Sequence, residues 1–135
     1  MNVAQVPAQH VDRVWPMVGA FIASALRHSA GHMRVEDVRA EIARGNRQLW
    51  IASEGGPIRA VCVTRIAQYP ATRALWVQES AGTLGAVQHF WPHLVEFGKQ
   101  WGCETVCFMG RRGWSKSGVL PPEFKHMSDF WVAEL

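Results

Sequence analysis

The stretch that decides the fold is ALWVQESAGTLGAVQHFWPHLVEFGKQW, residues 74–101. Ala74–Glu79 predicts a short strand, and Ser80–Gly85 after it is a loop that contains two glycines. From Val87 to Trp101 apolar residues recur at spacings of three and four, which predicts one buried face of a helix. The stretch therefore predicts a strand, a glycine loop and a helix.

An antiparallel meander is predicted upstream of this stretch. Leu49–Ser53 and Ile58–Ile66 have the composition of strands, and Glu54–Pro57 between them is typical of a turn. Tyr69–Pro70 turns the chain a second time. Because short connections join antiparallel neighbours, both segments and Ala74–Glu79 should lie in one sheet.

Two helices are predicted nearer the start of the chain, after a short strand at Asn2–Val6. Apolar residues spaced three and four apart mark the first helix, over residues 11–26. Ser29–Gly31 interrupts the pattern, and a shorter helix begins near Val35 and ends before Gly45. These helices should flank the sheet.

The last third of the chain predicts more sheet. Glu104–Met109 has the pattern of a strand, Gly110–Gly113 is a loop, and Phe124–Met127 with Phe130–Glu134 predicts a closing hairpin. With 48% hydrophobic and 19% charged residues, the composition is that of an ordinary globular protein. We therefore expect one α/β (α+β) domain, residues 1–135, with a mixed, mostly antiparallel central sheet flanked by helices.

This order of elements resembles that of the Gcn5-related N-acetyltransferases (GNAT), over essentially the whole chain. Short stretches carry the resemblance: His10–Pro16, Gln48–Ala52 and Gly110–Trp114. The chain is similar in particular to the small acetyltransferase-like proteins of bacteriophages and prophages. The resemblance implies a GNAT fold and acetyl-coenzyme A (acetyl-CoA) as the group donor.

In the GNAT family the strand before the glycine loop splays from its neighbour, and the loop wraps the pyrophosphate of acetyl-CoA. The family pattern is Arg or Gln, two residues, Gly, one residue, and Gly or Ala. Started at Gln78, it places Ala81 and Thr83 at the two glycine positions, so the cofactor loop is degenerate. The resemblance still implies these cofactor-binding residues: Val77, Gly82, Thr83, Leu84, Gly85, Ala86 and Arg111.

The catalytic groups that the resemblance implies are only partly present. Glu79 is the carboxylate nearest the expected splay, so it is the candidate general base. The alternative is that Glu79 is a solvated residue at a strand end. The family often uses a tyrosine as general acid, but the one tyrosine here, Tyr69, precedes the loop.

Two functions follow from these residues. One is an acetyl-CoA-dependent N-acetyltransferase that binds its cofactor weakly, transfers slowly, and admits its amine from the side of the first two helices. The other is a non-catalytic phage or prophage virion or assembly protein that reuses the fold to bind a protein. Seven tryptophans favour a protein partner or self-association through an exposed Trp/Arg surface. A net charge of +3 without a basic stripe disfavours nucleic acid.

The cysteines and histidines indicate neither a disulfide framework nor a metal site. Cys62 and Cys107 lie in apolar runs, so both should be buried and reduced. His89 and His93 have helical ligand spacing but lack an evident third ligand. Without a signal peptide or an apolar run long enough for a bilayer, we expect no membrane contact. The expected location is the cytoplasm of a bacterial host, or a virion.

Overall fold

The computed structural model describes residues 1–110 and 120–135. Its sheet has five strands in the order β1-β2-β3-β4-β5. The strands are β1 Asn2–Val6, β2 Gln48–Ser53, β3 Ile58–Gln68, β4 Arg73–Gly82 and β5 Thr105–Phe108. β1 to β4 are antiparallel to their neighbours, whereas β4 and β5 are parallel. The expected mixed, mostly antiparallel sheet is confirmed.

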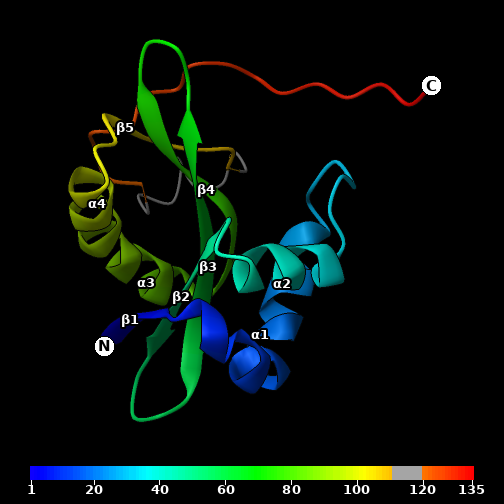
Figure 1. Ribbon diagram of the computed structural model, residues 1–135, viewed down its shortest axis with the longest axis vertical. Helices are drawn as coiled ribbons and strands as arrows, with labels where there is room; N and C mark the ends of the chain where they lie inside the picture. The colour runs from blue at the N-terminus through cyan, green and yellow to red at the C-terminus, as the bar shows by residue number, and fades with distance from the viewer. Residues whose placement is uncertain (111–119) are drawn as a thin grey trace.

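Helices cover both faces of this sheet (Figure 1). On one face lie α1 Val11–Leu26, preceded by the 3₁₀ turn η1 Ala8–His10, and α2 Val35–Ala43. On the other face, α3 Leu84–Val87, the 3₁₀ turn η2 Gln88–Phe90 and α4 Trp91–Gln100 follow one another. The expected α/β class is therefore confirmed.

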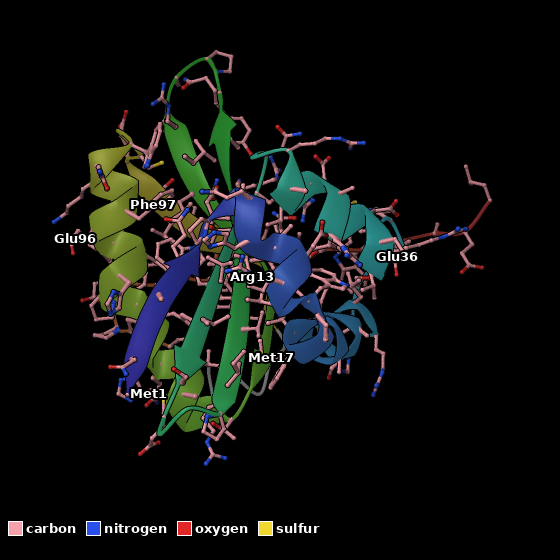
Figure 2. All side chains as sticks on the ribbon, turned by 60° about the horizontal axis from the view of Figure 1, so that its bottom comes forward. Met1, Arg13, Met17, Glu36, Glu96 and Phe97 are labelled. Atoms are coloured by element: carbon pink, nitrogen blue, oxygen red, sulfur yellow. The ribbon has the colours of Figure 1, made fainter. Side chains whose placement is uncertain are left out.

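Each face of the sheet has its own hydrophobic core because successive residues of a strand point to opposite sides. On β3, Val61 and Val63 pack with α1 and α2, in a cluster that includes Val18, Ile22, Val38 and Ile42. Cys62, between them, faces the other way, into a cluster with Trp50, Leu75, Phe90, Leu94 and Phe97. Figure 2 shows Phe97 directed from α4 toward the sheet and Glu96 directed away from it.

The helix after the glycine loop begins earlier than expected and is interrupted. It was expected over Val87–Trp101, but it begins at Leu84, changes to a 3₁₀ turn at residues 88–90 and ends at Gln100. Pro92 explains the interruption, because its ring clashes with the carbonyl four residues earlier and it has no N–H to donate. That position is Gln88, where the 3₁₀ turn starts.

β4 is longer than the sequence predicts. The expected strand ends at Glu79, but β4 continues to Gly82, paired with β3 as far as Ala60. Serine, alanine and glycine are weak strand formers on their own, so this extension depends on pairing with β3. The expected loop Ser80–Gly85 is consequently reduced to Thr83, and Gly82 and Gly85 lie in a strand and a helix.

The expected closing hairpin is wrong. Residues 124–135 contain no strand, and the end of the chain runs away from the sheet in Figure 1. Phe130, Trp131 and Val132 are 60%, 85% and 56% exposed. A hairpin is marginal in water unless it packs on other elements, and these side chains are too exposed to supply that packing.

The cysteines only partly follow expectation. All three are free, and Cys62 is buried as expected, but Cys107 is only half-buried, so that expectation is wrong. Cys107 lies on β5, the last strand of the sheet, where fewer elements cover it. No helix among the described residues is long and apolar enough to cross a membrane.

Candidate functional site

A cleft of about 440 Å³ opens where β4 runs on beyond β5. β5 pairs only with Ala74–Val77, so the rest of β4 has no partner on that side among the described residues. We call this opening the β4 cleft. Its walls are Ser24–Leu26 of α1, residues 28–30, 32 and 33 of the following loop, Val77–Gly82 of β4, Val87, Phe108–Gly110 and Phe130.

A one-residue irregularity in β4 sets the orientation of Glu79. Val63 of β3 pairs with Glu79, but the next residue, Thr64, pairs with Val77, which leaves Gln78 as an extra residue. Directly paired residues share a face of the sheet. Glu79 therefore shares the α1–α2 face with Val63, whereas an uninterrupted strand would place it with Val77 on the α4 face.

Glu79 is buried and ion-paired rather than solvated. Its side chain is 7% exposed and that of Arg47 is 11% exposed. Arg47 Nη1 donates to both carboxylate oxygens, at 3.2 Å each. Burial raises the pKa of the Glu79 carboxyl above its ordinary value, and the charge and hydrogen bonds of Arg47 offset part of that rise. A buried carboxylate with a raised pKa in a cleft is suited to accept a proton.

A buried thiol lies next to this carboxylate across the sheet. Cys62 pairs with Ser80, the residue after Glu79. Burial raises the pKa of the Cys62 thiol, and the negative charge of Glu79 raises it further. Because the thiolate is the nucleophilic form, Cys62 is chemically inert in this environment.

The backbone of β4 at Gly82 lies in close contact with β3. Its φ is +128°, and a Cβ there would lie 2.4 Å from the carbonyl oxygen of Arg59. The N–H of Thr83 donates to that same oxygen at 3.2 Å. Thr83 then starts α3, because its carbonyl accepts from the N–H groups of Ala86 and Val87. Only glycine permits this close approach before the helix starts.

A second, smaller cavity of about 60 Å³ lies on the α4 side of the same splay. It shares Val77, Ser80, Val87 and Phe108 with the β4 cleft, so the two flank one opening in the sheet. Phe124 lines this cavity, with ring centroids 4.8 Å from Trp91 and 5.1 Å from Phe108. The segment after residue 120 therefore packs against α4 and β5 before the chain end leaves the body.

The described residues expected to bind the cofactor lie in one stretch from Val77 in β4 to Ala86 in α3. Val77 and Gly82 line the β4 cleft, and Thr83, Leu84 and Gly85 follow at the start of α3. A Cβ at Gly85 would meet no atom within 4 Å, which leaves room for a ligand. Ala86 is buried in the core of the α4 face, so only its backbone is available. Arg111 lies outside the described residues.

Sequence reasoning missed Arg47 and the cleft wall formed after α1. Arg47 is 32 residues from Glu79 in the chain, and no local pattern distinguishes it from the other arginines. His28 and His32, which no motif in the sequence singles out, also line the β4 cleft. Among the described residues, no group of three or more His, Cys, Asp or Glu could hold a metal ion.

Comparison by sequence finds no relative. No protein-family model matches the chain, and no curated protein matches it. The fold can therefore be compared only with solved structures.

Several solved structures have a similar fold. An aminoglycoside acetyltransferase from an uncultured soil metagenomic sample, in complex with sisomicin, superposes with a TM-score of 0.71 at 8% identity, over 99% of this chain and 96% of that one. A ribosomal-protein-alanine N-acetyltransferase from Brucella melitensis biovar Abortus 2308 gives 0.68 at 11% identity, over 99% and 96%. A predicted acetyltransferase from Clostridium acetobutylicum, solved with acetyl-CoA, gives 0.66 at 12% identity, over 98% and 95%.

These structures superpose on nearly the full length of the chain. At such low identity the likeness concerns the fold and leaves substrate and activity open. The structure has the fold of the Gcn5-related N-acetyltransferases.

Proposed function

We propose that this protein is an acetyl-CoA-dependent N-acetyltransferase in which Glu79 is the general base. The observation that carries the proposal is the place of Glu79: a buried carboxylate in a cleft at the point where β4 and β5 separate. A base must reach the amine that attacks the acetyl group. The end of α1 and the loop after it form one wall of this cleft, and the amine is expected to enter from that side.

The residues present could bind acetyl-CoA through backbone groups of β4 and α3 and through the open space beside Gly85, without a positively charged side chain in the described part of the cleft lining. β4 beyond Val77 has no strand partner on its β5 side among the described residues, and Gly85 leaves open space at the start of α3. Neither Lys nor Arg is among the described residues that line the cleft. Binding by backbone N–H groups without a cation supports weak capture of a pyrophosphate.

In the proposed reaction, acetyl-CoA supplies an acetyl group activated as a thioester. Glu79 takes a proton from the ammonium form of the amine, directly or through one water molecule. The neutral nitrogen would then bond to the acetyl carbon as the carbon–sulfur bond breaks, and its second proton would pass to water. The thiolate leaves with its electron pair and takes up a proton from solvent. Tyr69, the kind of residue that serves as the acid in the family, is not among the described residues that line the cleft, which supports slow transfer.

The first test is binding. A ligand that binds only the folded state raises its stability by RT ln(1 + [L]/Kd), about 2.7 kcal/mol at a ligand concentration of 100 Kd. We expect acetyl-CoA to raise the melting temperature saturably, at concentrations well above those typical of tight binders. No shift at millimolar acetyl-CoA would overturn the proposal.

The second test is the base. We expect Glu79→Gln to lower kcat/KM for acetyl transfer by about 10²–10⁴, the usual contribution of a general base. Its effect on acetyl-CoA binding should be small, because the carboxylate faces the amine side of the cleft. The control is Glu96→Gln, since Glu96 is exposed on α4 and lies away from the cleft. Equal activity in both variants would reject Glu79 as the base.

The alternative of a phage or prophage assembly protein gains no support from the solved structures compared above, which are acetyltransferases. The binding test separates the two functions, because an assembly protein has no need to bind acetyl-CoA. Binding through an exposed Trp/Arg surface stays a prediction; among the described tryptophans, Trp101 and Trp131 are exposed.

A further inference from the structure

The charges lining the β4 cleft bear on the kind of amine it accepts, an inference that rests on the proposed function. Among the described residues that line the cleft, Glu79 is the only acidic side chain. Its charge is already matched by Arg47, at 3.2 Å from both carboxylate oxygens. His28 and His32 also line the cleft, and neither adds negative charge.

The rest of the lining is largely apolar. Leu26 and Met33 contribute from the α1–α2 side, and Phe108, Met109 and Phe130 contribute from the opposite side. Met109 is 63% exposed and Phe130 is 60% exposed, so this side of the cleft keeps apolar surface that a ligand can cover. Covering such surface favours binding because apolar area is removed from water, and ligand sites are commonly apolar with a few placed polar groups.

A substrate with several positive charges is poorly matched to this cleft. Its second ammonium group would lose water without gaining a carboxylate, which is costly. The chain also carries a net charge of +3, which repels a polycation. We infer that the acceptor is a primary amine with a single positive charge and an apolar or aromatic body. The nitrogen lies at Glu79, and the body lies against Met33, Phe108 and Phe130.

The inference is tested by comparing two amines on the full chain. Isothermal titration is carried out with 2-phenylethylamine and with spermidine, each with and without saturating coenzyme A, and initial rates of acetylation are measured in parallel. We expect 2-phenylethylamine to bind about tenfold or more tighter than spermidine, since burial of one aromatic ring is worth at least that factor. Methylamine, which lacks the apolar body, should bind as weakly as spermidine.

Two variants alter the cleft in opposite ways. Ala30→Glu places a second carboxylate on the exposed loop that lines the cleft, and spermidine should then bind several-fold tighter. Phe130→Ala removes apolar lining, and 2-phenylethylamine should then bind several-fold more weakly. The matched control is Met17→Glu, which adds the same charge on α1 at an exposed residue outside the cleft lining and is labelled in Figure 2. It should change neither affinity.

Tighter binding of spermidine than of 2-phenylethylamine by the unaltered chain would overturn the inference. So would the binding of neither amine, or an equal response of spermidine to Ala30→Glu and Met17→Glu. The titrations without coenzyme A keep this test apart from that of the proposed function. If acetyl-CoA fails to bind, the acetyltransferase proposal fails, while the preference between the two amines still decides this inference.

Discussion

At the scale of single residues, the ion pair between Arg47 and Glu79 governs the chemistry that the cleft can perform. Removing two charges from water costs free energy, and the pair recovers it only in part. The result is a carboxylate whose pKa is raised by burial and restrained by one guanidinium. Arg47 is therefore a positioning residue that also sets the pH range in which Glu79 can accept a proton.

We predict that Arg47→Met moves the rising limb of the kcat/KM–pH profile to higher pH. Arg47 lowers the pKa of Glu79, so its removal lets burial raise that pKa further. The pH at which Glu79 ceases to stabilise the fold should also move upward in Arg47→Met. A carboxyl whose folded-state pKa is raised stabilises the fold at low pH, and this contribution is lost as the pH rises through the folded-state pKa.

Urea unfolding of Arg47→Met at several pH values checks this second effect, and the loss of stability should extend to higher pH than in the unaltered chain. Arg39→Met is the control. Arg39 pairs with Asp12 at the surface, where the two side chains are 37% and 74% exposed, so the ion pair itself should contribute less than about 1 kcal/mol. A rising limb that stays in place in Arg47→Met would show that Arg47 does not act through Glu79.

At the scale of elements, the contact between the end of β4 and β3 fixes where α3 starts. Gly82 has a positive φ and no space for a side chain. The N–H of Thr83 donates a hydrogen bond to the carbonyl oxygen of Arg59, the atom nearest to a Cβ at Gly82. The strand therefore meets the helix through one close backbone approach, not through a long loop.

We predict that Gly82→Ala lowers the free energy of unfolding by about 2 kcal/mol or more, since it combines a strained φ with a backbone clash. Gly85→Ala is the matched change three residues on. Gly85 has open space around it, so alanine there should be neutral or stabilise the helix by up to about 1 kcal/mol. Urea denaturation of both variants measures the difference, and similar midpoints would contradict the close approach.

Local patterns in the sequence predict most of the elements but not the geometry between them. The meander strands and both N-terminal helices depend on apolar spacing within a few residues, and all of them form. The one-residue shift at Gln78 depends on pairing with β3, and the pair of Arg47 with Glu79 joins residues 32 apart. Periodicity carries no information about either contact, so Glu79 could be selected as a candidate while its burial could not be predicted.

At the scale of the whole molecule, the sheet separates two hydrophobic cores, and the C-terminal segment packs beside the α4 core through Phe124. Phe124 packs with Trp91 and Phe108 beside the α4 core. The residues after it are exposed, including Trp131 and Leu135. The stability of the fold should therefore depend on Phe124 and much less on the last residues.

We predict that deletion of residues 128–135 changes the free energy of unfolding by less than about 1 kcal/mol, as exposed residues usually contribute little. Phe124→Ala should cost about 1–3 kcal/mol, because it removes two aromatic contacts and their buried area. Chemical denaturation of both proteins tests the contrast. A larger loss from the deletion than from Phe124→Ala would mean that the tail is packed in solution.

The extra residue in β4 makes the site sensitive to sequence length as well as to residue identity. Successive side chains of a strand point to opposite faces of the sheet. Deletion of Gln78 would therefore put Val77 and Glu79 next to each other and change the faces on which the residues before and after the deletion lie relative to one another. Two outcomes are open to such a deletion: Glu79 turns toward Cys62 and leaves Arg47, or residues 73–77 change faces. Deletion of Gln78 should therefore reduce activity more than Gln78→Ala, which keeps the number of residues in β4. Assays of these two variants would distinguish the effect of strand length from the effect of the Gln78 side chain.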